Sequence, residues 1–193
     1  SEGASAWSFV LTPTGKVDAW LRVTRRTEEN FILDLDGGFA HHLVSRLQRF
    51  LLRTRCSIEP LNWMMLTVVN GDARPPTNGL VIPVHWPRLT ALDLLGPSVD
   101  PPEGLVVGEG SEWERHRIRA GIPAMGAELD ESTIPGATGV LEQSVSFTKG
   151  CYTGQELVAR IDSRSAGTPN RLVRAKGRTK TGVETPPPGS RLE

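Results

Sequence analysis

The most specific stretch of this sequence runs Lys149-Gly150-Cys151-Tyr152-Thr153-Gly154-Gln155-Glu156. Leu157, Val158 and Ile161 follow it at the spacing of one apolar helix face, so we expect a helix directly after the stretch. Thr153 and Glu156 stand in the Thr-x-x-Glu relation of a capping box. This relation predicts that the helix begins near Thr153.

Cys151 is the residue whose chemistry this arrangement would change most. It precedes the predicted helix start, where unpaired amides and the positive end of the helix dipole stabilise a thiolate. Lys149 adds a cation two residues earlier, and Gly150 and Gly154 allow the backbone to approach a ligand closely. The pattern predicts a reactive, partly exposed thiol beside an open cavity, while a buried cysteine in a tight turn fits the same residues equally well.

Upstream of this stretch, the N-terminal third predicts strands and one helix. Residues 7–11 and 17–24 are apolar runs on either side of Thr12-Pro13-Thr14-Gly15, which is a hairpin signal. Further strands are predicted at 31–35, 56–61 and 64–69, with an amphipathic helix at 39–54. This order of elements is typical of a compact α+β unit.

The middle of the chain is rich in Pro and Gly and predicts shorter elements. Strands are expected at 80–84 and 105–107, a short helix near 86–95, and a helix at 111–120. Ser111 and Glu114 form a capping box at the start of the last of these, and Gly121 followed by Pro123 ends it. We therefore expect an α+β fold with modules at 1–73 and 74–168, and the start of another module at 169–193.

The composition describes a globular protein without a strong overall charge. Lys and Arg number 22, as do Asp and Glu, so no global field favours nucleic acid, and direct nucleic-acid binding is not expected. The two cysteines, Cys56 and Cys151, form neither a disulfide framework nor a zinc pair, which favours a reducing compartment such as the cytoplasm. No apolar run approaches the about 20 residues of a membrane helix, and no signal peptide is recognisable. Both ends suggest a piece of a longer protein.

The stretch at 149–156 resembles the signature of YgfZ-type folate-binding proteins, which are relatives of the aminomethyltransferase (T-protein) of glycine cleavage. The similarity continues in short segments on both sides: Leu11-Thr12-Pro13-Thr14-Gly15-Lys16, Arg117-Ile118-Arg119-Ala120-Gly121-Ile122-Pro123, Thr133-Ile134-Pro135 and Val145-Ser146-Phe147. The resemblance covers most of residues 9–175 and is strongest over 117–172.

The resemblance implies the T-protein fold: ferredoxin-like mixed sheets with helices around a central channel that holds tetrahydrofolate, followed by a C-terminal β-barrel. It also implies an accessory protein that supports iron–sulfur cluster assembly or repair, including that of tRNA-thiolating iron–sulfur proteins. Cys151, with Lys149, would be the chemical centre. The alternative is a non-catalytic folate-binding or docking protein for iron–sulfur clients.

Two departures make a true aminomethyltransferase the least favoured function. Asp18 is followed by Ala19, so the acidic pair of the T-protein is incomplete. Arg119 stands where many relatives carry a glutamate that faces the pterin, and a guanidinium donates hydrogen bonds but accepts none.

Several further side chains are candidates for contact with folate. Arg117, Arg164 and Arg171 suit the carboxylates of its glutamate tail, although ordinary surface ion pairs are the simpler interpretation. The candidates for the ring system are Tyr152, Gln155, Arg119 and Trp20. Core packing of Tyr152 and a helix-start role of Gln155 are the respective alternatives. No histidine or cysteine pair has metal-ligand spacing, so no metal site is predicted.

Overall fold

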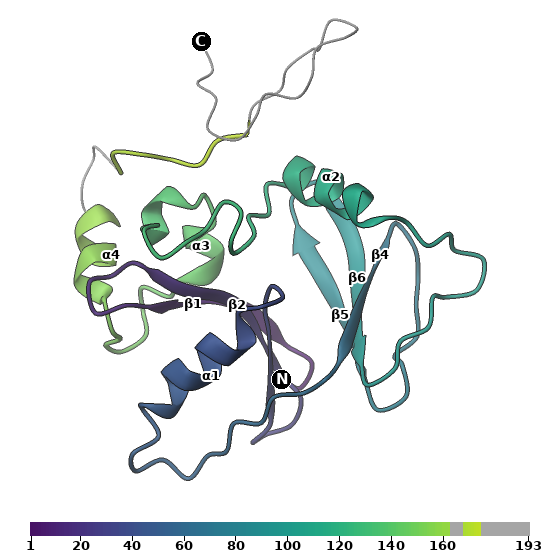
Figure 1. Ribbon diagram of the computed structural model, residues 1–193, viewed down its shortest axis with the longest axis horizontal. Helices are drawn as coiled ribbons and strands as arrows, with labels where there is room; N and C mark the ends of the chain where they lie inside the picture. The colour runs from purple at the N-terminus through teal and green to yellow at the C-terminus, as the bar shows by residue number, and fades with distance from the viewer. Residues whose placement is uncertain (163–167, 175–193) are drawn as a thin grey trace, which may run out of the picture.

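The computed structural model describes residues 1–162 and 168–174, and it contains two three-stranded sheets with helices around them (Figure 1). The first sheet has the order β1-β2-β3 and is built from Ser5–Leu11, Val17–Arg25 and Phe31–Asp34. Thr12-Pro13-Thr14-Gly15 joins β1 to β2 as predicted, because Gly15 adopts a positive φ of 79° that a tight turn needs. Helix α1 (Ala40–Gln48) covers one face through Leu43, which packs on Ala19 and Leu21 of β2.

The second sheet has the order β4-β6-β5, with Met64–Val69, Leu89–Gly96 and Leu80–Trp86 as its strands. Helix α2 (Gly110–Ala120) follows it, and then a 3₁₀ turn η1 (Pro135–Ala137), α3 (Leu141–Ser144) and α4 (Gln155–Asp162). Figure 1 shows α3 and α4 beside the first sheet and α2 beside the second. No helix in the described ranges has both the length and the apolar character needed to cross a bilayer.

The alternation of side chains along β2 sets up two cores. Ala19 and Leu21 point to α1, whereas Trp20 points to the opposite side, where the largest cluster of buried side chains lies. Val17 joins the same cluster as Trp20 because the strand register shifts between Val17 and Ala19, which interrupts the alternation at Asp18. That cluster joins both sheets, the end of α2 and the loop behind it. Its buried members are Val17, Trp20, Trp86, Leu89, Ala91, Ala120, Ile122, Met125, Leu129 and Val140. The two sheets are therefore halves of one packed unit.

The Lys-Gly-Cys-Tyr stretch docks on the tip of the β1–β2 hairpin. A Cβ on Gly154 would lie 2.7 Å from the carbonyl oxygen of Thr12 and 2.8 Å from Cα of Gly15, and Gly154 has a positive φ of 79°. A Cβ on Gly15 would likewise lie 2.6 Å from Cβ of Leu157. Gly154 thus permits a close backbone contact within the fold, in place of the ligand contact expected from the sequence.

The prediction of a helix near 86–95 is wrong, because most of this segment forms strand β6. Trp86 pairs with Leu89 across a two-residue turn, in which Arg88 has a positive φ of 70°, and β6 then pairs with β5 and β4 on its two edges. The central position buries Ala91, Leu94 and Leu95 on both faces of the sheet. A strand buried on both faces lacks the period-two pattern, and its apolar run resembles a helix segment.

Other predicted boundaries also differ from the structure. Residues 56–61 and 105–107 form no strand, and α1 ends at Gln48 rather than near 54. Glu112 rather than Glu114 reaches back at the start of α2, where its carboxylate accepts a hydrogen bond from the Glu109 amide at 3.3 Å. Helix α4 begins at Gln155, two residues beyond the predicted start. Local propensity suggested strands at 56–61 and 105–107, but neither segment pairs with a strand in the part of the chain that the structure describes.

The predicted α+β class is confirmed, and both sheets are antiparallel throughout rather than mixed. Short connections account for the antiparallel pairs β1-β2, β2-β3 and β5-β6, since parallel neighbours need long crossovers, whereas β4 and β6 are neighbours with β5 between them in the chain. The T-protein-like channel, the barrel and the module boundaries stay predictions. Strand β4, from the first predicted module, pairs with β6 in the second sheet. Of the predicted barrel segment 169–193, residues 175–193 lie outside the described residues.

Candidate functional site

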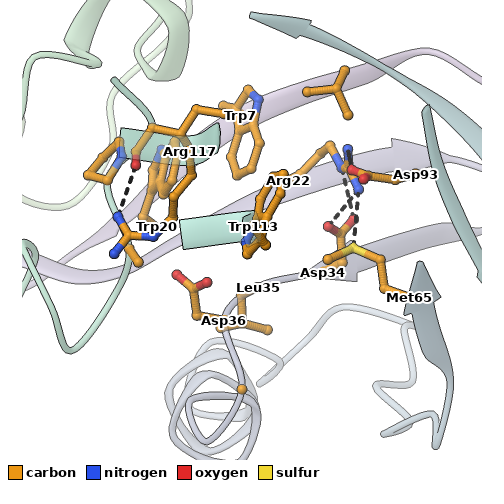
Figure 2. A pocket seen from close by; sticks show the side chains of 15 residues that line it. Trp7, Trp20, Arg22, Asp34, Leu35, Asp36, Met65, Asp93, Trp113 and Arg117 are labelled. Carbon is orange, nitrogen blue, oxygen red and sulfur yellow. Dashed lines mark hydrogen bonds and ion pairs between the residues drawn. The ribbon is translucent and has the colours of Figure 1, made fainter. Parts of the chain in front are cut away.

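A cavity of about 170 Å³ lies between the two sheets, with the start of the loop after α2 on its rim. Figure 2 shows the side chains that line it, which come from β1, β2, β3, β6 and α2 among other segments. Its walls contain three indole rings, two arginines and three carboxylates: Trp7, Trp20, Trp113, Arg22, Arg117, Asp34, Asp36 and Asp93. Both the aromatic and the charged groups are thus gathered from distant parts of the chain.

The aromatic wall is held rigidly by ring contacts. Trp7 of β1 and Trp20 of β2 lie diagonally across paired strands, and their rings stack with centroids 4.1 Å apart. Trp86 packs edge-on against both rings. The indole nitrogen of Trp20 donates a hydrogen bond to Oγ of Ser144 at 2.9 Å, which ties α3 to the sheet. Trp113, on α2, is only half-buried. Stacked, fixed rings of this kind offer a planar surface to a flat aromatic ligand.

Arg22 occupies one end of the cavity and links the two sheets. Its guanidinium donates to Asp34 through Nε at 3.1 Å and through Nη2 at 2.9 Å, and to Asp93 of β6 through Nη1 at 2.7 Å. Thr67 of β4 donates to the other oxygen of Asp93 at 2.7 Å. The guanidinium also lies 5.6 Å from the ring of Trp7. The side chains of this buried network form hydrogen bonds with one another, so the network is a fixed wall of the cavity.

Burial shapes the ionisation of this network. Burial alone would lower the pKa of Arg22, but the charges of Asp34 and Asp93 outweigh it, so the pKa of Arg22 is raised. Desolvation raises the pKa of Asp34 above its ordinary value of 3.8, and the attraction of Arg22 offsets only part of that effect. The network therefore favours the charged form of Arg22 more than it favours the charged form of Asp34.

Asp36 lies at the mouth of the cavity, just after β3, and is exposed to solvent. Its Oδ2 accepts a hydrogen bond from the backbone amide of Met125 at 2.8 Å, which pins the loop after α2 to the first sheet. Desolvation raises the pKa of Asp36, although the hydrogen bond from the Met125 amide and the charge of Arg117 oppose the change. In Figure 2 its carboxylate points from the chain toward the side of the cavity where Trp20 and Arg117 lie.

Arg117 is buried, and its hydrogen-bonding capacity is used within the fold. Nε and Nη2 bind the carboxylate of Glu114, Nη1 and Nη2 bind that of Glu128, and Nη1 also donates to the carbonyl of Ile122. The hydrogen bonds to Glu114, which outweigh the opposing effect of burial, raise the pKa of Arg117. Five donated bonds equal the five N–H groups of a guanidinium. Arg117 therefore braces the cavity wall and has no donor left for a folate carboxylate.

Cys151 is exposed and lines neither this cavity nor the second hollow that the structure shows. Its neighbours turn toward each other: the ammonium of Lys149 lies 4.8 Å from the ring of Tyr152, and Oε1 of Gln155 accepts a hydrogen bond from the Tyr152 amide at 3.1 Å. Burial raises the pKa of the half-buried Tyr152. Lys149, Tyr152 and Gln155 thus form a local cluster at the start of α4, outside the cavity.

The second hollow, about 200 Å³ in volume, lies between the β1–β2 hairpin and α1. Asp18 is its central group: one oxygen is 2.6 Å from Nε2 of His42, and the other is 2.9 Å from Nε of Arg46. Asp18, which the resemblance to the T-protein implies is half of an incomplete acidic pair, is therefore engaged with α1, on the side of the first sheet away from Trp20.

The remaining predicted folate contacts are dispersed. Arg119 is exposed on α2, and its carbonyl accepts a hydrogen bond from the side chain of Arg174. Arg171 is exposed, and Arg164 lies outside the described residues. No group of three potential metal ligands stands together in residues 1–162 and 168–174. Of the predicted cofactor residues, Trp20 and Arg117 alone line the cavity between the sheets within the described residues.

Sequence reasoning missed most of the cavity, including Trp7, Arg22, Asp36 and Asp93. A partial signal was present in β2, where Trp20 and Arg22 alternate onto the same face as Thr24, so that a buried arginine beside a tryptophan was foreseeable. Asp36 and Asp93 carry no such signal, because their neighbours in space come from segments far away in the chain.

Comparison with known proteins supports the family resemblance over part of the chain. An uncharacterised protein of Haemophilus influenzae is 27% identical over 168 residues, which are 86% of this chain and 58% of that protein. The tRNA-modifying protein YgfZ of Yersinia pestis, like that of Yersinia pseudotuberculosis, is 44% identical over 59 residues, which are 30% of this chain and 18% of that protein. No protein-family model matches the chain. The chain is thus similar to part of YgfZ and spans little more than half of its longer-matching relative.

Proposed function

We propose that the protein is a tetrahydrofolate-binding accessory protein of the YgfZ type, whose cavity between the sheets receives the pterin ring of folate. The observation that carries the proposal is the meeting of three indole rings with carboxylates in one cavity. A pterin is flat and aromatic, and its amino-pyrimidine edge donates parallel hydrogen bonds, so it needs both kinds of group.

The size of the cavity supports a partial insertion of folate. At about 170 Å³ it is smaller than the roughly 300–1,000 Å³ of pockets that enclose whole drug-sized ligands. It suits one ring system, with the aminobenzoyl-glutamate part outside. Since the donors of Arg117 are used within the fold and Arg164 lies outside the described residues, the exposed Arg171 is the remaining predicted partner for the glutamate tail among the residues that the structure describes.

The functional thiol belongs to a separate surface in this proposal. Cys151 is exposed at the start of α4, where a partner protein can reach it, and Lys149 stands beside Tyr152 on the same surface. YgfZ relatives carry the name of tRNA-modifying proteins, which favours a supporting role in tRNA modification, with iron–sulfur enzymes as the clients implied by the resemblance. A folate ring in the cavity and a thiol on the surface fit such an accessory role.

The alternative is a non-catalytic protein that binds folate or docks iron–sulfur clients without thiol chemistry. It is favoured by the position of Cys151, which lines neither hollow. A true aminomethyltransferase stays the least favoured function. Arg119 brings no carboxylate to the pterin, and Asp18 is engaged with His42 and Arg46.

The test is calorimetric titration of the protein with tetrahydrofolate under reducing conditions, with the variants Trp113→Ala and Cys151→Ser. The half-buried Trp113 lines the cavity, and loss of a stacked ring costs about 1–3 kcal/mol, so we expect roughly 5–150-fold weaker binding. Cys151→Ser should keep the affinity of the original protein, and Trp63→Phe, a ring that does not line the cavity, is the matched control. Absence of binding by the unmodified protein would overturn the proposal.

The two accessory roles differ in what the thiol does. Loss of client activity in Cys151→Ser with unchanged folate affinity supports thiol function. Unchanged client activity in the same variant supports the docking protein.

A further inference from the structure

We infer that Asp36 is the residue that selects the ligand of the cavity, and that it does so by accepting the paired N–H groups of a 2-amino-4-oxo-pyrimidine edge. The inference rests on the proposed function and names the residue that would give it specificity. Arg119 lies exposed, outside the cavity lining, so a partner for this edge has to come from the carboxylates of the cavity itself.

Elimination among the carboxylates of the cavity leads to Asp36. Asp34 holds Arg22 with both oxygens, and Asp93 divides its oxygens between Arg22 and Thr67. Glu114 and Glu128, behind the wall, are both engaged with Arg117. A ligand competing for any of these would have to break a network that holds the fold together.

Asp36 differs because only one of its oxygens is committed. Oδ2 accepts the Met125 amide, and no partner of Oδ1 is found among residues 1–162 and 168–174. A carboxylate has about four lone-pair sites, so one amide bond leaves room for two parallel N–H donors. Asp36 also lines the cavity and is exposed to solvent, so it is accessible to a ligand that enters from the mouth.

The surroundings strengthen the preference for a donor edge. Arg117, whose charge acts on Asp36, is saturated by two glutamates and the Ile122 carbonyl and presents no free donor. The hydrogen bond from the Met125 amide holds the Asp36 carboxylate in place before a ligand arrives, which reduces the entropy lost on binding. A ring with acceptors at the same edge would face an unpaired anion and be rejected.

The variant Asp36→Asn separates the ligand role from the structural role. The amide oxygen of the new side chain can still accept a hydrogen bond from the Met125 N–H, so the loop after α2 keeps its contact with the first sheet. The NH₂ group of the new side chain would face the N–H groups of a pterin, and two donors cannot form a hydrogen bond. Glu142→Gln is the matched control, because Glu142 is an exposed carboxylate on α3 that does not line the cavity.

The experiment measures the affinity of the original protein and both variants for 6-methylpterin and for 6-methyllumazine, which has oxygen in place of the 2-amino group. We expect the original protein and Glu142→Gln to prefer the pterin at least about ten-fold, which is 1.4 kcal/mol, and Asp36→Asn to lose that preference. Preference retained in Asp36→Asn overturns the inference and leaves the proposed function standing. Failure of the original protein to bind either pteridine or tetrahydrofolate overturns both.

Discussion

Replacement of Gly154 by alanine should destabilise the protein strongly, because this glycine is where the Lys-Gly-Cys-Tyr stretch meets the β1–β2 hairpin. Its φ of 79° lies in the left-handed region, which costs an L-residue about 1–2 kcal/mol. The new Cβ would also lie 2.7 Å from the Thr12 carbonyl oxygen and 2.8 Å from Cα of Gly15. Both atoms belong to the backbone, so relief requires a shift of the hairpin, at a further cost of about 1–3 kcal/mol.

The expected loss is therefore about 2–5 kcal/mol, a large part of the about 5–15 kcal/mol that stabilises a typical domain. Urea denaturation followed by tryptophan fluorescence measures it, since Trp20 and Trp86 are buried in the core that the hairpin enters. Gly150→Ala is the matched control within the same stretch, because nothing lies within 4 Å of a Cβ at that position. We expect a change within about 0.5 kcal/mol for the control.

The comparison of the two alanine variants decides the matter. Equal stability of Gly154→Ala and Gly150→Ala would show that the close contact between the stretch and the hairpin does not exist in solution. The account of why the sequence carries a glycine there would then be wrong.

Three other outcomes follow from the cavity and the thiols. Arg22→Met should lower the free energy of unfolding by about 3–5 kcal/mol, because two carboxylates lose their partner in the interior, while Arg53→Met at an exposed position changes it little in the same urea titration. Burial disfavours the ionised form of Asp36, so the free energy of unfolding should fall as pH rises from 3.8 through the raised pKa of Asp36. Asp36→Asn without ligand should remove that fall. A pH profile of thermal unfolding that is the same in both proteins would contradict the stated cause. Iodoacetamide should modify both Cys56 and Cys151 in the folded protein, since both thiols are free and exposed, and mass spectrometry showing either one protected until denaturation would contradict that exposure.

Some of the fold was predictable because it depends on neighbours in sequence. The turn at Thr12-Pro13-Thr14-Gly15 and the stop of α2 at Gly121 need a positive φ, and a glycine marks each of them. Strands β1, β2 and β3 were recognisable from their apolar runs. Strand β6 was missed because a strand covered on both faces loses the alternation that identifies it.

The candidate site divides in the same way. Cys151 stood out because several unusual residues surround it within one short stretch, and the sequence alone also indicated the resemblance to YgfZ-type proteins. The sequence also predicted a cavity beside Cys151, but the direction in which a side chain faces depends on what the helix packs against. Gly154 meets the hairpin, and the sulfur stays exposed, lining neither hollow.

The sequence by itself determined the α+β class, the first sheet, the limit of α2 and the likeness to a known group of proteins. Only the tertiary structure decided that Trp7, Trp20 and Trp113 share a cavity with Asp36. It also decided that Arg117 forms ion pairs with Glu114 and Glu128 within the fold. The physical reason is that turns and caps are set by dihedral angles and hydrogen bonds over a few residues. A binding cavity is formed where two sheets close on each other, through contacts such as Asp36 with Met125, which are 89 residues apart in the chain.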